Sequence, residues 1–333
     1  MSSLAIGIDV GGTSLRAALV ERDGVIVRSA KRALVGRSPA EMLDQLTLLV
    51  ESLAPVPADA PMAVGFAALL LPREGLVAVG PAFGWRDVPI GALLAQRFGR
   101  PVRLVNDLDA ITVGEAMCGA GRQRGPGDSA GVGAGSRDLM CVFVGTGVGM
   151  GVVSQGTLVE GADGLATELG HTKIESPTTG RPCGCGERGC LEAYTSGSHL
   201  PKLLAEKVAT GLASPLFAEA AGDPSRVNAR TLEGAAAVGD PAACALWEDI
   251  AARLGTGIAN AVTLFNPRLL VLGGGVLLLA PSLRARVVTR IREAVARAHL
   301  ARLEICDTRL GDEAGVIGAG LLAHDAARPA LPG

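Results

Sequence analysis

Residues 168–192, with the sequence ELGHTKIESPTTGRPCGCGERGCLE, constrain this chain more than any other stretch. Three of the seven cysteines fall here, at Cys183, Cys185 and Cys190, and His171 lies just upstream. One imidazole and three thiolates form a complete tetrahedral ligand set for Zn²⁺, and four protein ligands with no open position are typical of a structural site. The alternative is a set of unliganded core thiols, but cysteines spaced C-x-C-x4-C among glycines make a poor apolar core. The spacing therefore predicts a structural zinc site.

The same segment carries a carboxylate at each end, Glu168 and Glu192. A metal that pins both ends of the segment would also fix these two side chains in space. We therefore expect a polar binding site beside the metal.

Composition excludes several classes of protein. The chain has 333 residues, enough for two domains, and its 48% hydrophobic and 19% charged residues allow a large core and exclude wholesale disorder. The formal net charge of -2 provides no basic field for nucleic acid or for a membrane surface. The first residues, MSSLAIGIDVGG, lack the charged start of a targeting peptide, and no apolar stretch is long enough to span a membrane. We expect a soluble, cytoplasmic protein whose remaining cysteines are reduced core thiols.

Strands and helices interleave along the chain, which predicts an α/β fold with mixed sheets. Stretches that begin near residues 4 and 139 both run strand, glycine-threonine turn, strand, turn, strand. This indicates an internal duplication, although two glycine-rich hairpins can also resemble each other by chance. The Gly-rich, polar residues 121–137 predict a loop at a domain boundary. We expect an N-terminal domain over residues 1–120, with a closing helix over about 314–330 packed back on it, and a C-terminal domain over 121–313 that contains the zinc-binding loop 168–192.

Two local patterns define elements near the N-terminus. Ser38 is a suitable N-cap and Pro39 a suitable first residue for a helix over residues 39–53. The apolar run MAVGFAALL, residues 62–70, predicts a single strand.

Two glycine turns are candidate phosphate sites. The sequence DVGGT, residues 9–13, joins two expected strands, and its glycines let backbone N–H groups approach phosphate oxygens closely. Asp9 at the end of the strand is placed to hold Mg²⁺, directly or through water. The sequence GTG at residues 145–147 repeats the pattern in the second half. Each turn alone can also be an ordinary hairpin, and together they favour phosphate binding.

Asn106 and Asp107 stand where an expected strand ends and a helix begins. The Asp107 carboxylate can accept a proton from a substrate hydroxyl as that oxygen attacks a γ-phosphoryl group. The alternative is that Asn106, Asp107 or Asp109 only caps the helix. The sequence LGGG at residues 272–275 offers a flat surface for a purine and ribose, or is a simple loop.

These motifs, in this order, resemble those of the ROK family of bacterial sugar kinases and related repressors, within the actin/hexokinase superfamily. The resemblance covers about residues 4–323 and is most specific in CxCGxxGCLE. It implies a two-domain, actin-like ATPase (ribonuclease H-like) α/β fold with the active site in the interdomain cleft. It also implies a hexose substrate, ATP, Mg²⁺, structural Zn²⁺, and a homodimer or dimer of dimers.

The resemblance assigns a role to each matching residue. Asp107 is the expected general base, and the expected sugar ligands are Asn106, Glu168, His171 and Glu192. The expected zinc ligands are His171, Cys183, Cys185 and Cys190. The expected contacts of ATP and Mg²⁺ are Asp9, Gly11, Gly12, Thr13, Thr146 and Gly147 at the phosphates, with Gly273 and Gly274 beside the adenosine.

The chain departs from the family pattern around the sugar. Ala82 stands where an asparagine is expected, and Ala67-Ala68 replaces a Pro-Gly pair. The expected reaction is phosphorylation of glucose to glucose 6-phosphate. The alternatives are a kinase for N-acetylmannosamine or N-acetylglucosamine, for which these alanines make room, and a non-catalytic sugar-sensing regulator.

Overall fold

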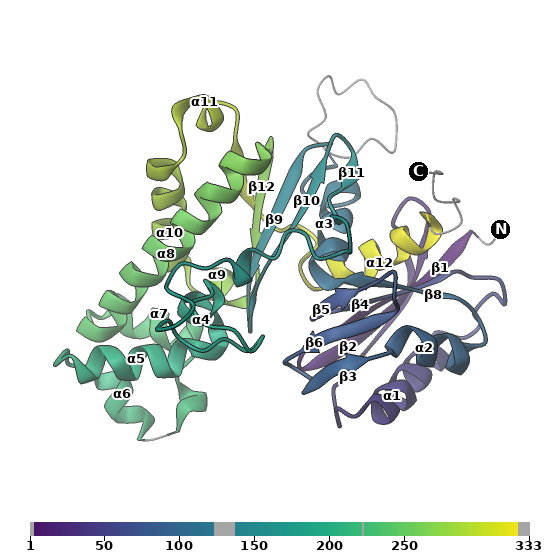
Figure 1. Cartoon of the computed structure of the whole chain (residues 1–333), viewed down its shortest axis with the longest axis horizontal. Coiled ribbons are helices and arrows are strands. Elements are labelled where there is room, and N and C mark those ends of the chain that lie inside the picture. Colours follow the sequence, from purple (N-terminus) through teal and green to yellow (C-terminus); the bar gives the residue numbers. More distant parts are fainter. Residues whose placement is uncertain (1–2, 123–136, 222, 326–333) are drawn as a thin grey trace. The chain divides into compact units, whose positions relative to one another are not determined.

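The computed structural model describes residues 3–122, 137–221 and 223–325. The chain forms two compact units (Figure 1). Unit 1 comprises the described residues within 1–141, 151–167 and 308–333, and unit 2 those within 142–150 and 168–307. Residues 123–136 of the predicted loop and residues 326–330 of the predicted closing helix lie outside the described residues.

The strands form three sheets. The first contains β1 (Leu4–Val10), β2 (Ser14–Glu21), β3 (Ile26–Ala33), β4 (Met62–Phe66) and β8 (Val102–Asn106) in the order β3-β2-β1-β4-β8. The second contains β9 (Leu139–Val144), β10 (Val148–Ser154), β11 (Thr157–Leu158), β12 (Leu269–Gly273) and β13 (Glu304–Asp307) in the order β11-β10-β9-β12-β13. The third contains β5 (Leu69–Leu71), β6 (Leu76–Gly80) and β7 (Trp85–Val88). The first two sheets thus share one strand order, as the repeated sequence pattern predicts.

Helices complete both units. In unit 1 they are α1 (Pro39–Glu51), α2 (Ile90–Phe98), α3 (Asp107–Met117) and α12 (Ala314–Asp325), with the short 3₁₀ turn η4 (Gly311–Glu313). In unit 2 they are α4 (Glu192–Thr195), α5 (Leu200–Ala209), α6 (Pro215–Ala220), α7 (Ala229–Ala237), α8 (Pro241–Phe265), α9 (Gly275–Leu279), α10 (Pro281–Ala294) and α11 (Arg297–Leu300), with the 3₁₀ turns η1 (Leu169–His171), η2 (Gly197–His199) and η3 (Pro224–Arg226). Among the residues described, no helix is both long and apolar enough to cross a membrane.

Side chains of a strand alternate between the two faces of its sheet, and helices cover both faces of the first sheet. Ile6, Ile8 and Val10 of β1 belong to the core that includes α1 and α2, whereas Ala5 packs with residues of α3 and α12. On this second face Gly7 is required, since a Cβ there would lie 2.1 Å from the carbonyl oxygen of Val316 in α12.

Local signals fix several boundaries. Ser38 caps α1 with a full capping box, and Pro39 is its first residue, as predicted. The single strand predicted over residues 62–70 is wrong, because the chain leaves the first sheet after Phe66 and Leu69 begins a strand of the third sheet. Strand pairing across that turn, which a local pattern cannot show, overrides the continuous apolar run.

Glu115 ties the end of α3 to the chain that leads into α12. Its side chain is fully buried and accepts hydrogen bonds from the Ala120 N–H (2.8 Å), the Leu310 N–H (2.9 Å) and the Thr308 hydroxyl. Replacing Glu115 by alanine should lower the free energy of unfolding by about 3–5 kcal/mol, because several buried donors lose their acceptor. Urea unfolding measures the loss, and Glu115→Gln, which keeps one oxygen, should cost less. Equal stability of the alanine variant and the wild type would contradict this role.

Candidate active site

Unit 1 brings the first glycine turn and Asp107 to one edge of a sheet. β1, β4 and β8 are parallel neighbours, with Val10 opposite Phe66 and Phe66 opposite Asn106. The glycine turn follows β1 and Asp107 follows β8, so both stand at the carboxyl ends of parallel strands, where ligands bind in open α/β sheets. Parallel neighbours are about 4.8 Å apart, which puts the two motifs roughly 10 Å apart along the edge.

Asn106 is the N-cap of α3. Its Oδ1 accepts hydrogen bonds from the N–H groups of Leu108 (2.8 Å) and Asp109 (3.4 Å), and its Nδ2 donates to the carbonyl oxygen of Ala68 (3.3 Å). The capping interpretation is therefore confirmed for Asn106. Asp107 is the first residue of the helix, and its Oδ1 also accepts from the Leu108 N–H at 2.9 Å. The catalytic and sugar-binding roles of this pair stay predictions.

Asp9 is part of a charged network that the sequence did not reveal. Its Oδ2 lies 3.3 Å from Nη1 of Arg16, the residue opposite it on β2, and Nη2 of Arg16 lies 2.6 Å from Asp312. Burial raises the pKa of Asp9, and Arg16 acts in the opposite direction. A hard cation such as Mg²⁺ would therefore meet a carboxylate already paired with a guanidinium.

The rest of the first glycine turn is half-buried or exposed, and backbone hydrogen bonds hold it in place. The Gly11 N–H donates to the carbonyl oxygen of Ser14 (3.0 Å), and Thr13 accepts from the Leu34 N–H (3.0 Å). A Cβ on Gly12 would lie 3.3 Å from the Cβ of Ala82. Ala82, which departs from the family pattern, is thus adjacent to this turn.

In unit 2, four side chains form a cluster suited to a metal ion. The Nδ1 or Nε2 of His171 and the sulfurs of Cys183, Cys185 and Cys190 all lie within 4.8 Å of one another. A tight turn, in which the Cys183 N–H donates to the Glu187 carbonyl (2.8 Å), brings two of the sulfurs together. These are the four residues that the sequence predicts as ligands.

The chemistry of the cluster fits Zn²⁺. A one-imidazole, three-sulfur set within this distance matches a closed tetrahedral site. Burial raises the pKa of the Cys183 thiol, so zinc binding must release a proton there. Nζ of Lys173 lies 3.0 Å from the sulfur of Cys190 and offsets part of the negative charge that thiolate ligands carry.

Glu192 connects the cluster of His171 and cysteine side chains to the second glycine turn. Its Oε2 accepts a hydrogen bond from the Val148 N–H (2.9 Å), and its Oε1 lies 3.6 Å from the sulfur of Cys183. A Cβ on Gly147 would lie 2.5 Å from Oε2, so a larger residue there would displace this carboxylate from its present position. A Cβ on Gly170 would lie 2.1 Å from the Val148 carbonyl oxygen. The turn η1, which contains His171, therefore packs directly against the same glycine turn.

The glycines after β12 pack on the strand that leads into this turn. A Cβ on Gly274, whose φ is +85°, would lie 2.4 Å from the carbonyl oxygen of Val144. Gly273 is buried against the ring of Phe143, and Gly274 is the more exposed of the two. Gly273 and Gly274, which we call the glycine corner, therefore share one region of unit 2 with the turn at Gly145–Gly147, Glu192 and the cysteine cluster.

One further element at this region was not predicted. The N–H of Gly197 in η2 donates to the Gly145 carbonyl (2.8 Å), and that of Ser198 to the Thr146 carbonyl (3.3 Å). The only sequence signal is the pair Ser196-Gly197, four and five residues beyond Glu192, and alone it predicts no more than a helix boundary.

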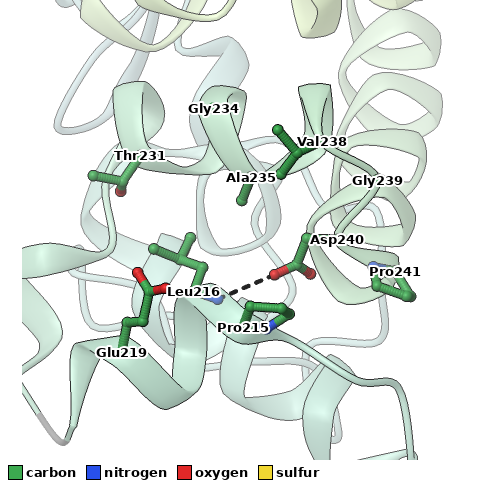
Figure 2. A pocket seen from close by; sticks show the side chains of 10 residues that line it. All are labelled: Pro215, Leu216, Glu219, Thr231, Gly234, Ala235, Val238, Gly239, Asp240 and Pro241. Carbon is green, nitrogen blue, oxygen red and sulfur yellow. Dashed lines mark hydrogen bonds between the residues drawn. The ribbon is translucent and has the colours of Figure 1, made fainter.

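A separate cavity in unit 2 contains none of the predicted site residues. Its volume is about 390 Å³, and it lies between α6, α7 and the start of α8 (Figure 2). Two carboxylates line it, Glu219 and Asp240, and Asp240 accepts hydrogen bonds from the Ser214 hydroxyl (2.7 Å), the Leu216 N–H (3.3 Å) and the Ala243 N–H (2.9 Å). These bonds cap helices, so the structure accounts for the Asp240 carboxylate without a ligand.

Comparison with known proteins identifies the family. The sequence profile of the ROK family matches residues 5–326. The chain belongs to the ROK family. It is 31% identical to a glucokinase of Thermotoga maritima over 324 residues, which cover 96% of this chain and 97% of the relative. It is also 31% identical to an N-acetylmannosamine kinase of Citrobacter koseri over 330 residues (97% and 99% coverage). A xylose repressor of Caldicellulosiruptor bescii is 28% identical over 327 residues, which cover 94% of this chain and 76% of that protein.

Solved structures of ROK proteins confirm the predicted fold class. A ROK glucokinase from Streptomyces griseus, in complex with glucose and AMPPNP, matches with a TM-score of 0.76 and 27% identity, over 97% of this chain and 99% of that chain. The two-domain, actin-like α/β fold is therefore the fold of this chain.

Asp109, a candidate cap, is instead buried on α3 with 8% of its surface exposed. Burial, with a smaller contribution from Glu160, raises its pKa to about 7, against a lowering effect of Arg103. The folded chain then binds a proton that the unfolded chain has lost between pH of about 4 and 7. Stability from this group is full below pH 4 and decreases as the pH rises to 7.

Asp109→Asn should therefore stabilise the protein above pH 7, by about 2–4 kcal/mol, and change little near pH 4. Urea unfolding at pH 4.5 and pH 8 measures the difference, and Asp59→Asn, at an exposed carboxylate, is the control. An equal effect of Asp109→Asn at both pH values would contradict the raised pKa.

Proposed function

We propose that this ROK protein transfers the γ-phosphoryl group of ATP to a hydroxyl of a hexose, with glucose as the first candidate. The observation that carries the proposal is the convergence in unit 2 of the cysteine–histidine cluster, Glu192 and the Gly145–Gly147 turn. Sugar ligands and a phosphate site then belong to one constellation, as transfer between the two substrates requires.

In the proposed reaction the acceptor hydroxyl oxygen forms a bond to the γ-phosphorus, and the bond from that phosphorus to the bridging oxygen of ADP breaks. Asp107 accepts the hydroxyl proton. Glu168, His171, Glu192 and Asn106 hold the remaining hydroxyls, so that analogues lacking them are rejected.

The two glycine turns, with Asp9, Thr13 and Thr146, surround the phosphates, and Gly273 and Gly274 flank the adenosine. Mg²⁺, when bound at Asp9, supplies positive charge to the phosphates. Zn²⁺ at His171, Cys183, Cys185 and Cys190 supplies rigidity to the segment that carries the sugar ligands.

Two other functions have observations in their favour. The small side chains of Ala67, Ala68 and Ala82 leave room for an acetamide, and the match to an N-acetylmannosamine kinase agrees with that. The match to a xylose repressor supports a sugar-sensing regulator. A regulator has no need for the acidic side chain at position 107.

A panel assay separates these functions. Purified protein with Mg-ATP is given glucose, mannose, fructose, N-acetylmannosamine and N-acetylglucosamine, and ADP release and zinc content are measured on one sample. We expect the highest kcat/KM with glucose. A higher value with an N-acetylhexosamine would identify the second function, and sugar binding without any turnover would identify the regulator. Polyphosphate in place of ATP tests the donor.

A further inference from the structure

Close packing, in addition to two hydrogen bonds, holds the turn η2 against the second glycine turn. A Cβ on Gly197 would lie 2.7 Å from the carbonyl oxygen of Gly145 and 3.1 Å from Cγ2 of Val276, the second residue of α9. Only glycine allows this approach. The side chains that follow Gly197 are therefore held next to both the proposed phosphate turn and the glycine corner of the proposed nucleotide site.

Ser198 and His199 form a small polar cluster with Ser196, the residue before Gly197. The hydroxyl of Ser196 lies 2.9 Å from Nδ1 of His199, that of Ser198 lies 3.2 Å from the same nitrogen, and the two hydroxyls are 3.1 Å apart. Ser196 is buried, whereas Ser198 is exposed and His199 is half-buried. The cluster thus has a buried anchor and two accessible polar groups.

This arrangement sets the chemistry of His199. When a hydroxyl donates to Nδ1, the neutral ring carries its proton on Nε2. In the part of the chain that the structure describes, no hydrogen bond to Nε2 is present. Burial lowers the pKa of His199, and although Glu192 acts in the opposite direction, the effect of burial is larger. The lowered pKa favours the neutral ring. The ring then presents one N–H donor, and Ser198 offers a hydroxyl beside it.

We propose that Ser198 and His199 extend the part of the donor-phosphate site that lies in unit 2 and donate hydrogen bonds to the β- and γ-phosphate oxygens of the nucleotide. This assignment rests on the proposed function, which places the phosphates at the Gly145–Gly147 turn. Phosphate oxygens are strong acceptors, and hydrogen bonds to them are stronger than those to neutral groups. A neutral donor orders the phosphates but raises the affinity for the ADP product less than the charged side chain of a lysine would.

The competing explanation is that the cluster only stabilises the turn. If the cluster only stabilises the turn, its loss would lower the thermal stability and weaken the binding of all ligands to a similar extent. A phosphate contact would change the binding of triphosphates and leave the binding of sugar and of adenosine unaltered.

The experiment uses titration calorimetry with Mg-AMPPNP, tripolyphosphate, adenosine and glucose on the full chain. His199→Ala and Ser198→Ala should each weaken the binding of AMPPNP and tripolyphosphate about tenfold, and leave the adenosine and glucose affinities within twofold. His199→Gln, whose amide can replace the Nε2 donor, should recover part of the loss. His299→Ala, at a histidine of α11 in the same unit, is the matched control and should bind all four ligands as the wild type does.

The outcomes separate this inference from the proposed function. Unchanged tripolyphosphate binding in His199→Ala and Ser198→Ala, or equal loss of all four ligands, would overturn the inference and leave the kinase function standing. Selective loss in a protein that phosphorylates no sugar would support the inference and reject the function. A wild-type protein that binds neither AMPPNP nor tripolyphosphate would overturn both.

Discussion

Replacing Asp107 by asparagine is expected to lower kcat for the sugar by about 10²–10⁴-fold while the Kd for the sugar changes less than threefold. Asparagine has the same shape and keeps an oxygen that can accept from the Leu108 N–H, which Oδ1 of Asp107 does at 2.9 Å. The start of α3 should therefore stay intact. What the amide cannot do is accept the proton of the attacking hydroxyl.

The measurement pairs steady-state turnover with calorimetric sugar binding, so that a folding defect is not taken for a chemical one. Asp109→Asn is the matched control, since it changes a carboxylate two residues further along the same helix that has no part in the proposed chemistry. It should keep the wild-type kcat. A turnover of more than half the wild-type value in Asp107→Asn would remove Asp107 as the base, and a lost sugar affinity would assign it to binding instead.

Much of unit 1 follows from local signals. The apolar residues 4–10 predict a buried strand, and the Ser38-Pro39 pair predicts where α1 begins. Gly99, with a φ of +63°, ends α2. In each case the physical cause lies within a few residues of the effect, so a single sequence contains it.

The third sheet could not be predicted in the same way. β5, β6 and β7 have three, five and four residues, and β6 and β7 were not expected. Phe83, in the turn before β7, and Trp85, the first residue of β7, have ring centroids 5.1 Å apart and are buried in the core of unit 1. Short strands of this kind are stabilised by such packing rather than by their own pattern.

The candidate site divides along the same line. The cluster of His171 and three cysteines could be predicted because the residue types and their spacing carry the chemistry of a metal site. The bond between Glu192 and the Val148 N–H could not, since a side chain reaches a backbone group 44 positions away. The same holds for the link from Arg16 to Asp312, and for the docking of η2 on the second glycine turn. The predicted homodimer also depends on surfaces that no local pattern defines, and it stays a prediction.

Replacing Cys190 by alanine should abolish stoichiometric zinc binding and raise the KM for the sugar about 10–100-fold. Cys190 is fully buried, and its sulfur lies 3.9 Å from that of Cys185. Three remaining ligands cannot close a tetrahedral structural site, so the segment loses the bond that holds its second half. Glu192 follows two residues later, and its position against the Val148 N–H depends on that half. The sugar affinity should decrease for this reason, although no sugar ligand has been changed.

Cys244→Ala distinguishes loss of a ligand from loss of any thiol. Cys244 lies on α8 in the same unit, half-buried and outside the cluster, so this variant should keep one zinc per chain and the wild-type KM. Zinc content by atomic absorption, the melting temperature and the KM for sugar and ATP are measured for both variants and for wild-type protein treated with a chelator. Because the proposed role of the metal is to order the sugar ligands, the chelated wild type should show the same defect as Cys190→Ala and regain activity when zinc is restored. One bound zinc and an unchanged sugar KM in Cys190→Ala would show that the cluster neither requires this thiolate nor positions Glu192, and the link between the metal and sugar binding would have to be abandoned.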